Sequence, residues 1–230
     1  MRTAGILPVK SFGAAKQRLG SLLGAGSRHA LAQAMFQDVL SSLRKVQAIE
    51  QIVVVASEPS VEFETEEQIV LLEDDAQAGQ SAAVLIGLRW ALAEGFGRVL
   101  LVPGDTPLLA VEEVDSLLSG AEADGSNVVI VPDRHETGTN ALLLSPPTAI
   151  EPSFGPDSLQ RHVAAAQAAG VSHRVERVPS LVFDVDTADD LAVVAAAIDK
   201  SRAVAPRTRG ALRQLDRAGA RMNAPAGAQT

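Results

Sequence analysis

The chain has 230 residues, of which 47% are hydrophobic and 21% charged, and its formal net charge is −8. This composition predicts one globular domain with a substantial core, and no apolar run reaches the ~20 residues that a membrane span needs. The absence of cysteine excludes disulfides, thiolate metal sites and cysteine nucleophiles, and it fits a cytoplasmic location. Aromatic residues make up only 3%, which argues against a base-stacking nucleic-acid surface.

Charge is unevenly distributed along the chain. Residues 1–49 carry seven Lys or Arg and one acidic residue, whereas residues 50–124 carry sixteen acidic residues and two basic ones. A basic N-terminal segment in an acidic chain is a candidate site for an anionic ligand, although solvated surface charges would give the same pattern.

Hydrophobic periodicity predicts strands that alternate with helices. The predicted strands are 4–9, 51–57, 69–74, 98–105, 127–133, 140–145 and 180–186. The predicted helices are 29–46, 81–97, with Ser81 as a candidate cap, 111–123, 156–170 and 187–200. This alternation predicts an α/β domain with a largely parallel sheet, in which ligands bind at the carboxyl ends of the strands.

The last thirty residues differ in composition from the rest. Residues 201–230 are rich in Ala, Arg, Gly and Pro and contain few large apolar side chains. We therefore expect a domain over residues 1–200, followed by a basic tail over 201–230. The tail is predicted to contain one helical stretch near 209–219 and to be disordered at its end.

Two aspartates end the apolar run "LVFDVD". In an extended strand, Asp184 and Asp186 would project from the same face, where two bare carboxylates repel each other. A hard cation such as Mg²⁺ removes that cost, because it prefers oxygen ligands. The alternative is that Asp186 caps the helix that follows, since acidic residues favour a helix start. Both roles are compatible.

A third aspartate follows another buried strand in "LLVPGDTPLL". Asp105 lies where an open α/β sheet presents ligand-binding groups, and Pro103 and Pro107 stiffen the turn around it. Gly-Asp is common in turns, so this motif alone is weak. Together with "DVD", it predicts two loops that offer three carboxylates, from Asp105, Asp184 and Asp186, to one cation.

A basic loop follows the first strand in "PVKSFGAAKQRLG". Lys10, Lys16 and Arg18 in this loop are candidates to bind a triphosphate and to neutralise a pyrophosphate leaving group. The alternative is an exposed loop with ordinary surface charges. The loop matches neither a Walker A motif nor a G-x-G-x-x-G fingerprint, which argues against P-loop and dinucleotide-binding functions.

Two polar turns add candidate anion contacts. One places Gly138, Thr139 and Asn140 just before a strand, and the other places Gly155 and Ser158 at a helix start, where backbone N–H groups attract phosphate or carboxylate. The alternative for Ser158 is an ordinary helix-start residue. The four histidines show no metal-ligand spacing, and we expect His162 to be a solvated or packing residue on its helix.

The ordered set of these motifs closely resembles the CofC/FbiD family of guanylyltransferases in coenzyme F420 biosynthesis. The resemblance covers about residues 4–195 and is carried by "PVK…AKQRL", "VPGDTPLL", "TGTNALLL", "FGPDSLQRH" and "FDVDT". It implies a single-domain nucleotidyltransferase fold of the glycosyltransferase-A kind, which is Rossmann-type α/β with helices on both faces of a mixed, mostly parallel sheet. It also implies transfer of GMP from GTP to phosphoenolpyruvate, 2-phospholactate or 3-phosphoglycerate.

The resemblance also implies roles for individual residues. It assigns Mg²⁺ to Asp105, Asp184 and Asp186, the phosphoacid to Thr139, Gly155 and Ser158, and the triphosphate to Lys10, Lys16 and Arg18. Gln80 and Ser81 replace the Leu-Asn that family members commonly have near the nucleotide, so they are candidate nucleotide contacts and could alter the choice of base. The chain also departs from the family's common Gly-Thr-Gly-Thr form at Glu136.

Partners and alternatives follow from the same resemblance. Many relatives pair, which implies a homodimer, and the family's product passes to a downstream transferase that acts on a deazaflavin precursor. Two alternatives remain: a related nucleotidyltransferase for molybdopterin or a sugar phosphate, and a noncatalytic nucleotide-binding protein. The non-glycine-rich first loop argues against the former, and the three acidic residues argue against the latter.

Overall fold

The computed structural model describes residues 1–9, 12, 16–20, 22–56, 67–74, 79–201 and 203–222. Its strands are β1 Thr3–Val9, β2 Gln51–Ala56, β3 Ile69–Glu73, β4 Arg98–Leu101, β5 Val128–Pro132, β6 Thr139–Leu144 and β7 His173–Val175. Its α-helices are α1 Ala25–Leu43, α2 Gln80–Ala93, α3 Val111–Asp124, α4 Ser158–Ala168, α5 Ala188–Lys200 and α6 Pro206–Met222, and a short 3₁₀ turn, η2, spans Gln17–Leu19.

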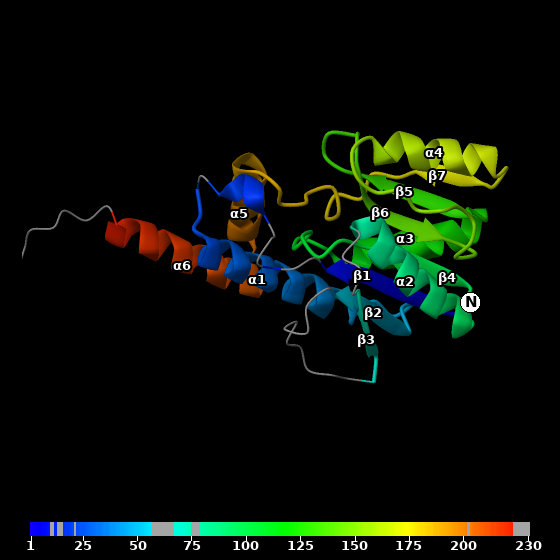
Figure 1. The fold of residues 1–230 in the computed structure, drawn as a ribbon, viewed down its shortest axis with the longest axis horizontal. Coiled ribbons are helices and arrows are strands. Elements are labelled where there is room, and N and C mark those ends of the chain that lie inside the picture. The colour runs from blue at the N-terminus through cyan, green and yellow to red at the C-terminus, as the bar shows by residue number, and fades with distance from the viewer. Residues whose placement is uncertain are drawn as a thin grey trace, which may run out of the picture.

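The strands form one seven-stranded sheet in the order β3-β2-β1-β4-β6-β5-β7 (Figure 1). All neighbouring pairs are parallel except those of β6, which runs antiparallel to both β4 and β5. The predicted α/β class with a mixed, mostly parallel sheet is confirmed. Because β6 is reversed, its first residues lie at the same edge of the sheet as the carboxyl end of β4.

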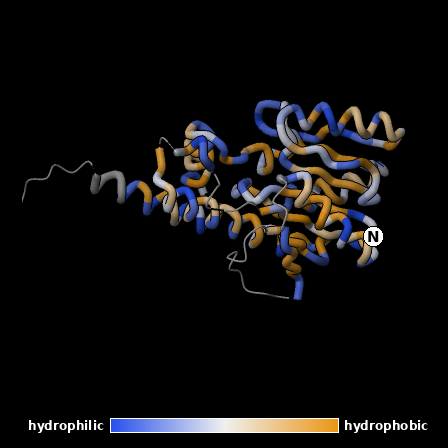
Figure 2. The backbone as a smooth tube through the Cα atoms, in the orientation of Figure 1, coloured by the Kyte–Doolittle hydropathy of each residue, from blue (hydrophilic) through white to orange (hydrophobic). Residues whose placement is uncertain are grey.

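Helices cover both faces of the sheet. Along β2, Ile52 and Val54 pack in one hydrophobic cluster with α1, α3 and α5, whereas Val53 and Val55 pack in the other with α2 and α4. A strand that is buried on both faces explains the unbroken β-branched run in its sequence. The strands accordingly form the most hydrophobic part of the chain trace (Figure 2).

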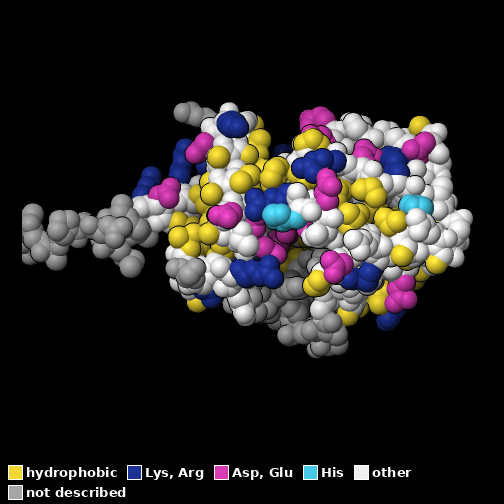
Figure 3. Space-filling view, turned by 90° about the horizontal axis from the view of Figure 1, so that it is seen from above, with side chains coloured by type: hydrophobic (Ala, Val, Ile, Leu, Met, Phe, Trp, Pro, Cys, Tyr) yellow, Lys and Arg dark blue, Asp and Glu magenta, His cyan; other side chains and the backbone are white. Residues whose placement is uncertain are grey.

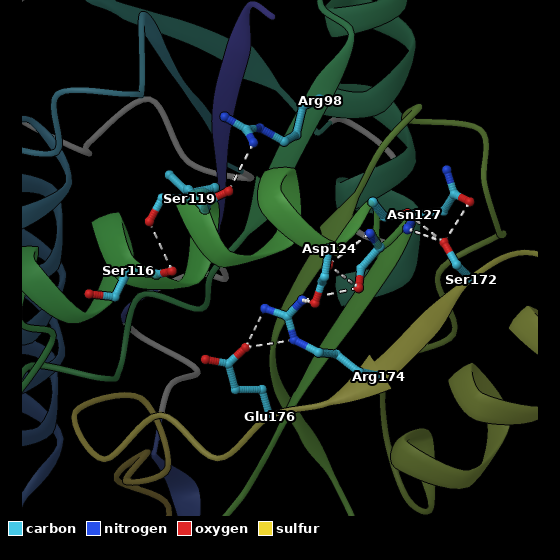
Figure 4. Close-up of polar contacts among 11 residues, drawn as sticks. Arg98, Ser116, Ser119, Asp124, Asn127, Ser172, Arg174 and Glu176 are labelled. Atoms are coloured by element: carbon cyan, nitrogen blue, oxygen red, sulfur yellow. Dashed lines mark hydrogen bonds and ion pairs between the residues drawn. The ribbon is translucent and has the colours of Figure 1, made fainter.

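The predicted last strand over 180–186 is wrong. Those residues form a turn, a bend and irregular backbone, and the seventh strand is β7, which pairs with β5. Polar contacts hold this edge (Figure 4): Arg174 pairs with Asp124 and with Glu176, and Ser172 donates a hydrogen bond to the Gly125 carbonyl at 2.7 Å. A three-residue, partly exposed edge strand carries no hydrophobic signal, so the sequence pattern misses it.

The helix in the C-terminal segment is longer than the predicted 209–219 and lies alongside α1 (Figure 1). Its start is held from a distant part of the chain, by Asp38 of α1. The Asp38 carboxylate accepts hydrogen bonds from the backbone N–H groups of Thr208 at 2.7 Å and Arg207 at 3.2 Å, and its side chain is only 2% exposed. Asp38 thus provides the N-terminal cap that Pro206 and its neighbours lack.

Among the helices of the described residues, none combines the length and the apolar character that crossing a bilayer requires.

We predict that Asp38→Ala lowers the free energy of unfolding by about 1–2 kcal/mol, because two N–H groups at the start of α6 lose their acceptor. Asp216→Ala removes an exposed charge from α6 itself and serves as the control. Urea denaturation measures both. Equal stability of the two variants would contradict the capping role of Asp38.

Candidate functional site

Three carboxylates converge where β4 and the segment before α5 end. Asp105 follows β4, and Asp184 and Asp186 precede α5; one carboxylate oxygen from each lies within 4.8 Å of the others. We call these three residues the acidic cluster. The buried Val185 joins the two loops, since its N–H donates to the Asp105 carbonyl at 3.2 Å. The predicted convergence therefore holds although the expected strand does not.

The start of α5 does not use Asp186 as a cap. Thr187 is the N-cap residue and forms a capping box with Asp190: the Thr187 hydroxyl accepts from the Asp190 N–H, and the Asp190 carboxylate accepts from the Thr187 N–H at 2.7 Å. Arg134 pairs with the same carboxylate at 2.8 Å. The helix is thus capped by Thr187 and Asp190, and the Asp186 carboxylate lies with those of Asp105 and Asp184.

The cluster concentrates negative charge in a partly buried place. Burial raises the pKa of Asp184 to about 6, and the nearby charges of Asp105 and Asp186 add to this effect. Asn140 opposes it by donating a hydrogen bond to the Asp184 carboxylate at 3.2 Å. A raised carboxyl pKa among three converging acids marks a place where a nearby cation would relieve the repulsion between them.

Lys16 supplies one such cation. Its ammonium group pairs with Asp105 and lies 3.1 Å from an Asp186 oxygen, and its side chain is 7% exposed. Burial opposes the charge, but the two carboxylates raise the pKa of Lys16 to about 12. Arg18 lies on the adjoining turn and is exposed. Lys10 lies outside the described residues.

The donor set of the acidic cluster fits a divalent cation. Besides the oxygen that meets Lys16, Asp105 presents a second oxygen, Oδ1, which is buried and has no hydrogen-bond partner among the described residues. A buried carboxylate oxygen without a partner is costly unless a cation contacts it. Three carboxylates are also the ligand type that Mg²⁺ prefers.

A second group of side chains lies at the start of β6 and of α4. Thr139 is 7% exposed, and its hydroxyl lies 2.9 Å from Nδ1 of His162, which is fully buried. Ser158 is the first residue of α4 and is 1% exposed. Gly155 precedes it with φ of 108°, a conformation that favours glycine. The structure thus joins Thr139, through His162, to α4, the helix that begins at Ser158.

A bulge in β6 links this group to the acidic cluster. Ala141 pairs with Val131, but Thr139 pairs with Pro132, which leaves Asn140 as an extra residue. Strict alternation would place Thr139 on the same face as Ala141, which packs in the core with α1 and α3. The bulge instead lets Thr139 contact α4 and lets Asn140 contact the acidic cluster, as bulges near functional sites often do.

The predicted nucleotide contacts lie on α2. This helix begins at Gln80 and is preceded by Gly79 with φ of 100°, so the candidate cap at Ser81 is wrong. The Ser81 hydroxyl instead accepts a hydrogen bond from the Phe154 N–H at 3.0 Å. Ser81 therefore ties α2 to the loop that carries Gly155.

Sequence reasoning missed how three residues support this site. Asn140 holds Asp184, His162 holds Thr139, and Arg161 donates to the backbone carbonyl groups of Ser153 and Phe154 at 2.8 and 3.1 Å. Each was present in a quoted motif, but Asn140 and His162 find their partners 44 and 23 residues away, which no local pattern reveals. Glu136, where the resemblance implies a glycine, has φ of 57°, a left-handed conformation that favours glycine, and nothing in the structure explains the glutamate.

Charged side chains of both signs meet in one region of the surface, although others are scattered over the same face (Figure 3). Seen from above, Lys and Arg, Asp and Glu, and His side chains meet at the middle of the face, between the part of the molecule that contains α5 and the part that contains the sheet (Figure 3). This arrangement offers cationic and anionic groups side by side. It suits a substrate that carries phosphates together with a metal ion.

Comparison with known proteins agrees with this geometry. The chain is 45% identical over 216 residues to the phosphoenolpyruvate guanylyltransferase of Conexibacter woesei, covering 94% of this chain and 97% of the relative. It is 36% identical to the 3-phospho-D-glycerate guanylyltransferase of Colwellia psychrerythraea, with coverages of 85% and 92%. It is 34% identical to the 2-phospho-L-lactate guanylyltransferase of Methanothermobacter thermautotrophicus, with coverages of 83% and 83%.

Solved structures support the fold alone. A putative nucleotide-diphospho-sugar transferase from Desulfovibrio desulfuricans superimposes with a TM-score of 0.74 at 20% identity, covering 94% of this chain and 96% of that chain. Residues 3–203 match the family described as "Guanylyl transferase CofC like". The chain therefore belongs to the family of CofC-like guanylyl transferases.

Proposed function

We propose that this protein transfers GMP from GTP to a phosphorylated three-carbon acid and releases pyrophosphate, as a step of coenzyme F420 biosynthesis. The observation that carries the proposal is the arrangement at the start of β6. There, Asn140 donates a hydrogen bond to Asp184 of the acidic cluster and the adjacent Thr139 contacts His162 of α4, so the metal and anion sites that we propose would lie next to each other. Family membership supplies the nucleotide and the class of acceptor.

The acceptor needs little activation by the protein. Its phosphate oxygen is already ionised at neutral pH, and it attacks the α-phosphorus of GTP in line. The bond from the α-phosphorus to the bridging oxygen breaks, and pyrophosphate leaves with the electron pair. No general base is required, so the protein's contribution is alignment and charge neutralisation. This agrees with a site rich in acids, bases and N–H groups.

The residues divide this work by charge. Asp105, Asp184 and Asp186 would hold Mg²⁺, which when bound would neutralise and orient the two anions. Lys16 and Arg18, together with Lys10, would hold the triphosphate and stabilise the departing pyrophosphate. Thr139, Gly155 and Ser158 would hold the phosphoacid at the start of α4, where the helix dipole favours an anion.

The expected place of Gln80 and Ser81 is beside the nucleotide, at the start of α2. The Ser81 hydroxyl accepts a hydrogen bond from the Phe154 N–H, so a shift of Ser81 on nucleotide binding would also move the loop that carries Gly155. We infer that this hydrogen bond fixes the position of the nucleotide site relative to the acceptor site.

A coupled turnover assay tests the proposed function. Purified protein, GTP and Mg²⁺ are mixed separately with phosphoenolpyruvate, 2-phospholactate and 3-phosphoglycerate, together with the downstream transferase and its deazaflavin substrate. We expect a deazaflavin product by mass spectrometry with one of the acids, and phosphoenolpyruvate is the first to test because of the 45% identical relative. Product with none of them, while a known family member is active in parallel, would contradict the proposal.

Asp184→Asn tests the acidic cluster, because we expect this variant to lose activity and to gain stability. We expect turnover to be lost, because a cation ligand is removed. The folded pKa of Asp184 is raised from 3.8 to about 6, so its ionised form destabilises the metal-free fold, and stability from this group falls as pH rises through about 6. Without metal at pH 7.5, the free energy of unfolding of Asp184→Asn, measured by urea denaturation, should therefore be about 1–3 kcal/mol higher than that of the unmodified protein. This difference should vanish near pH 4.

Asp189→Asn is the matched control, because Asp189 is an exposed acid on the first turn of α5. It should leave both turnover and stability near those of the unmodified protein. An active Asp184→Asn variant, or one less stable than the unmodified protein at pH 7.5 without metal, would show that Asp184 has a different role.

A further inference from the structure

His162 of α4 lies fully buried between two polar partners. Its Nε2 atom lies 2.9 Å from the backbone nitrogen of Ser153, and its Nδ1 atom lies 2.9 Å from the Thr139 hydroxyl. The Phe154 ring packs against the imidazole in a T-shaped arrangement with ring centroids 5.2 Å apart. The orientation of the ring is therefore fixed from several sides.

These contacts determine where the imidazole carries its proton. A backbone N–H group can only donate, so Nε2 must offer its lone pair to Ser153. A neutral imidazole with a free lone pair on Nε2 carries its hydrogen on Nδ1. The Thr139 hydroxyl consequently accepts a hydrogen bond from His162, and its own single proton remains available to another group.

The surroundings of the ring keep it neutral. Burial, together with the positive charge of the neighbouring Arg161, lowers the pKa of His162 to about 4. Arg161 also donates to the Ser153 side chain and carbonyl, at 2.9 and 2.8 Å, which holds the Ser153 N–H in place. A second proton, on Nε2, would point at this N–H group, and two hydrogen-bond donors would then face each other.

We propose that His162 is a positioning residue that fixes the Thr139 hydroxyl as a hydrogen-bond donor to the anionic acceptor. The inference rests on the proposed function, in which Thr139 contacts the phosphoacid. Phosphate and carboxylate oxygens can only accept hydrogen bonds, so a hydroxyl whose proton pointed to His162 would present a lone pair to an anion. The observed arrangement prevents that orientation.

A merely structural histidine makes a different prediction from a positioning one. Asparagine can place an N–H donor near the position of Nδ1, so His162→Asn retains the contact to Thr139 and loses that to Ser153. Glutamine can place an acceptor near the position of Nε2, so His162→Gln retains the contact to Ser153 and loses that to Thr139. Thr139→Val removes the hydroxyl at nearly constant shape.

Steady-state kinetics with phosphoacid and GTP varied separately distinguish the two roles. We expect His162→Gln to raise the KM for the phosphoacid by about 10- to 100-fold, the loss of one hydrogen bond to a charged group, with the KM for GTP unchanged. His162→Asn should keep a near-normal KM for the phosphoacid. The His162→Gln/Thr139→Val double variant should be no worse than Thr139→Val alone, because His162 acts through that hydroxyl.

Three kinetic results would overturn the inference: an unchanged phosphoacid KM in His162→Gln, equal loss in both His162 variants for both substrates, or additive effects of His162→Gln and Thr139→Val. If the unmodified protein turns over none of the acids, the proposed function fails instead. The tautomer still tests, without any need for turnover, the premise that the Thr139 hydroxyl accepts a hydrogen bond from His162.

Long-range ¹H–¹⁵N NMR of the unmodified protein reads the tautomer directly. The chain has four histidines, so the His162 signals can be assigned from their loss in a His162 variant or by elimination with variants of the other three. We expect the Nδ1–H form of His162 at pH 6.5–8. An Nε2–H form, or a doubly protonated ring in that range, would overturn the inference even if the variants do not fold.

Discussion

The repulsion among three carboxylates is the constraint on which the rest of this structure depends. Asp105, Asp184 and Asp186 approach one another because the end of β4 and the segment before α5 are joined by the Val185 N–H and the Asp105 carbonyl. The hydrophobic sheet positions these groups, but their mutual charge opposes folding. The neighbouring features can be understood as responses: the Lys16 ammonium, the Asn140 amide and a geometry that suits a divalent cation.

The reversed direction of β6 and the bulge at its start connect this charge to the second group of polar residues. Two adjacent residues, Thr139 and Asn140, contact α4 and the acidic cluster respectively. The phosphoacid and metal sites that we propose are thus held by one short stretch of backbone. Such rigid coupling matters for a transfer in which the protein's main task is to align two anions.

The sequence was sufficient to predict the α/β alternation and the convergence of the acidic cluster, and it failed where contacts are remote or polar. The convergence survives the loss of the expected strand over 180–186, because the hydrogen bond from the Val185 N–H to the Asp105 carbonyl joins the two loops without a strand partner. The short strand β7 is held by ion pairs of Arg174, which no hydrophobic pattern reveals. His162 and Asn140 find partners 23 and 44 residues away, and Asp38 caps a helix 170 residues away, so tertiary structure alone reveals their roles.

The most direct test of this account is a titration of Mn²⁺, a spectroscopic substitute for Mg²⁺, followed by electron paramagnetic resonance. It compares the unmodified protein with Asp105→Asn, which changes the residue whose Oδ1 is buried without a partner. We predict that the unmodified protein binds Mn²⁺ and that Asp105→Asn loses this binding, while circular dichroism shows the fold intact. Equal Mn²⁺ affinity in the two proteins would contradict the acidic cluster as the metal site.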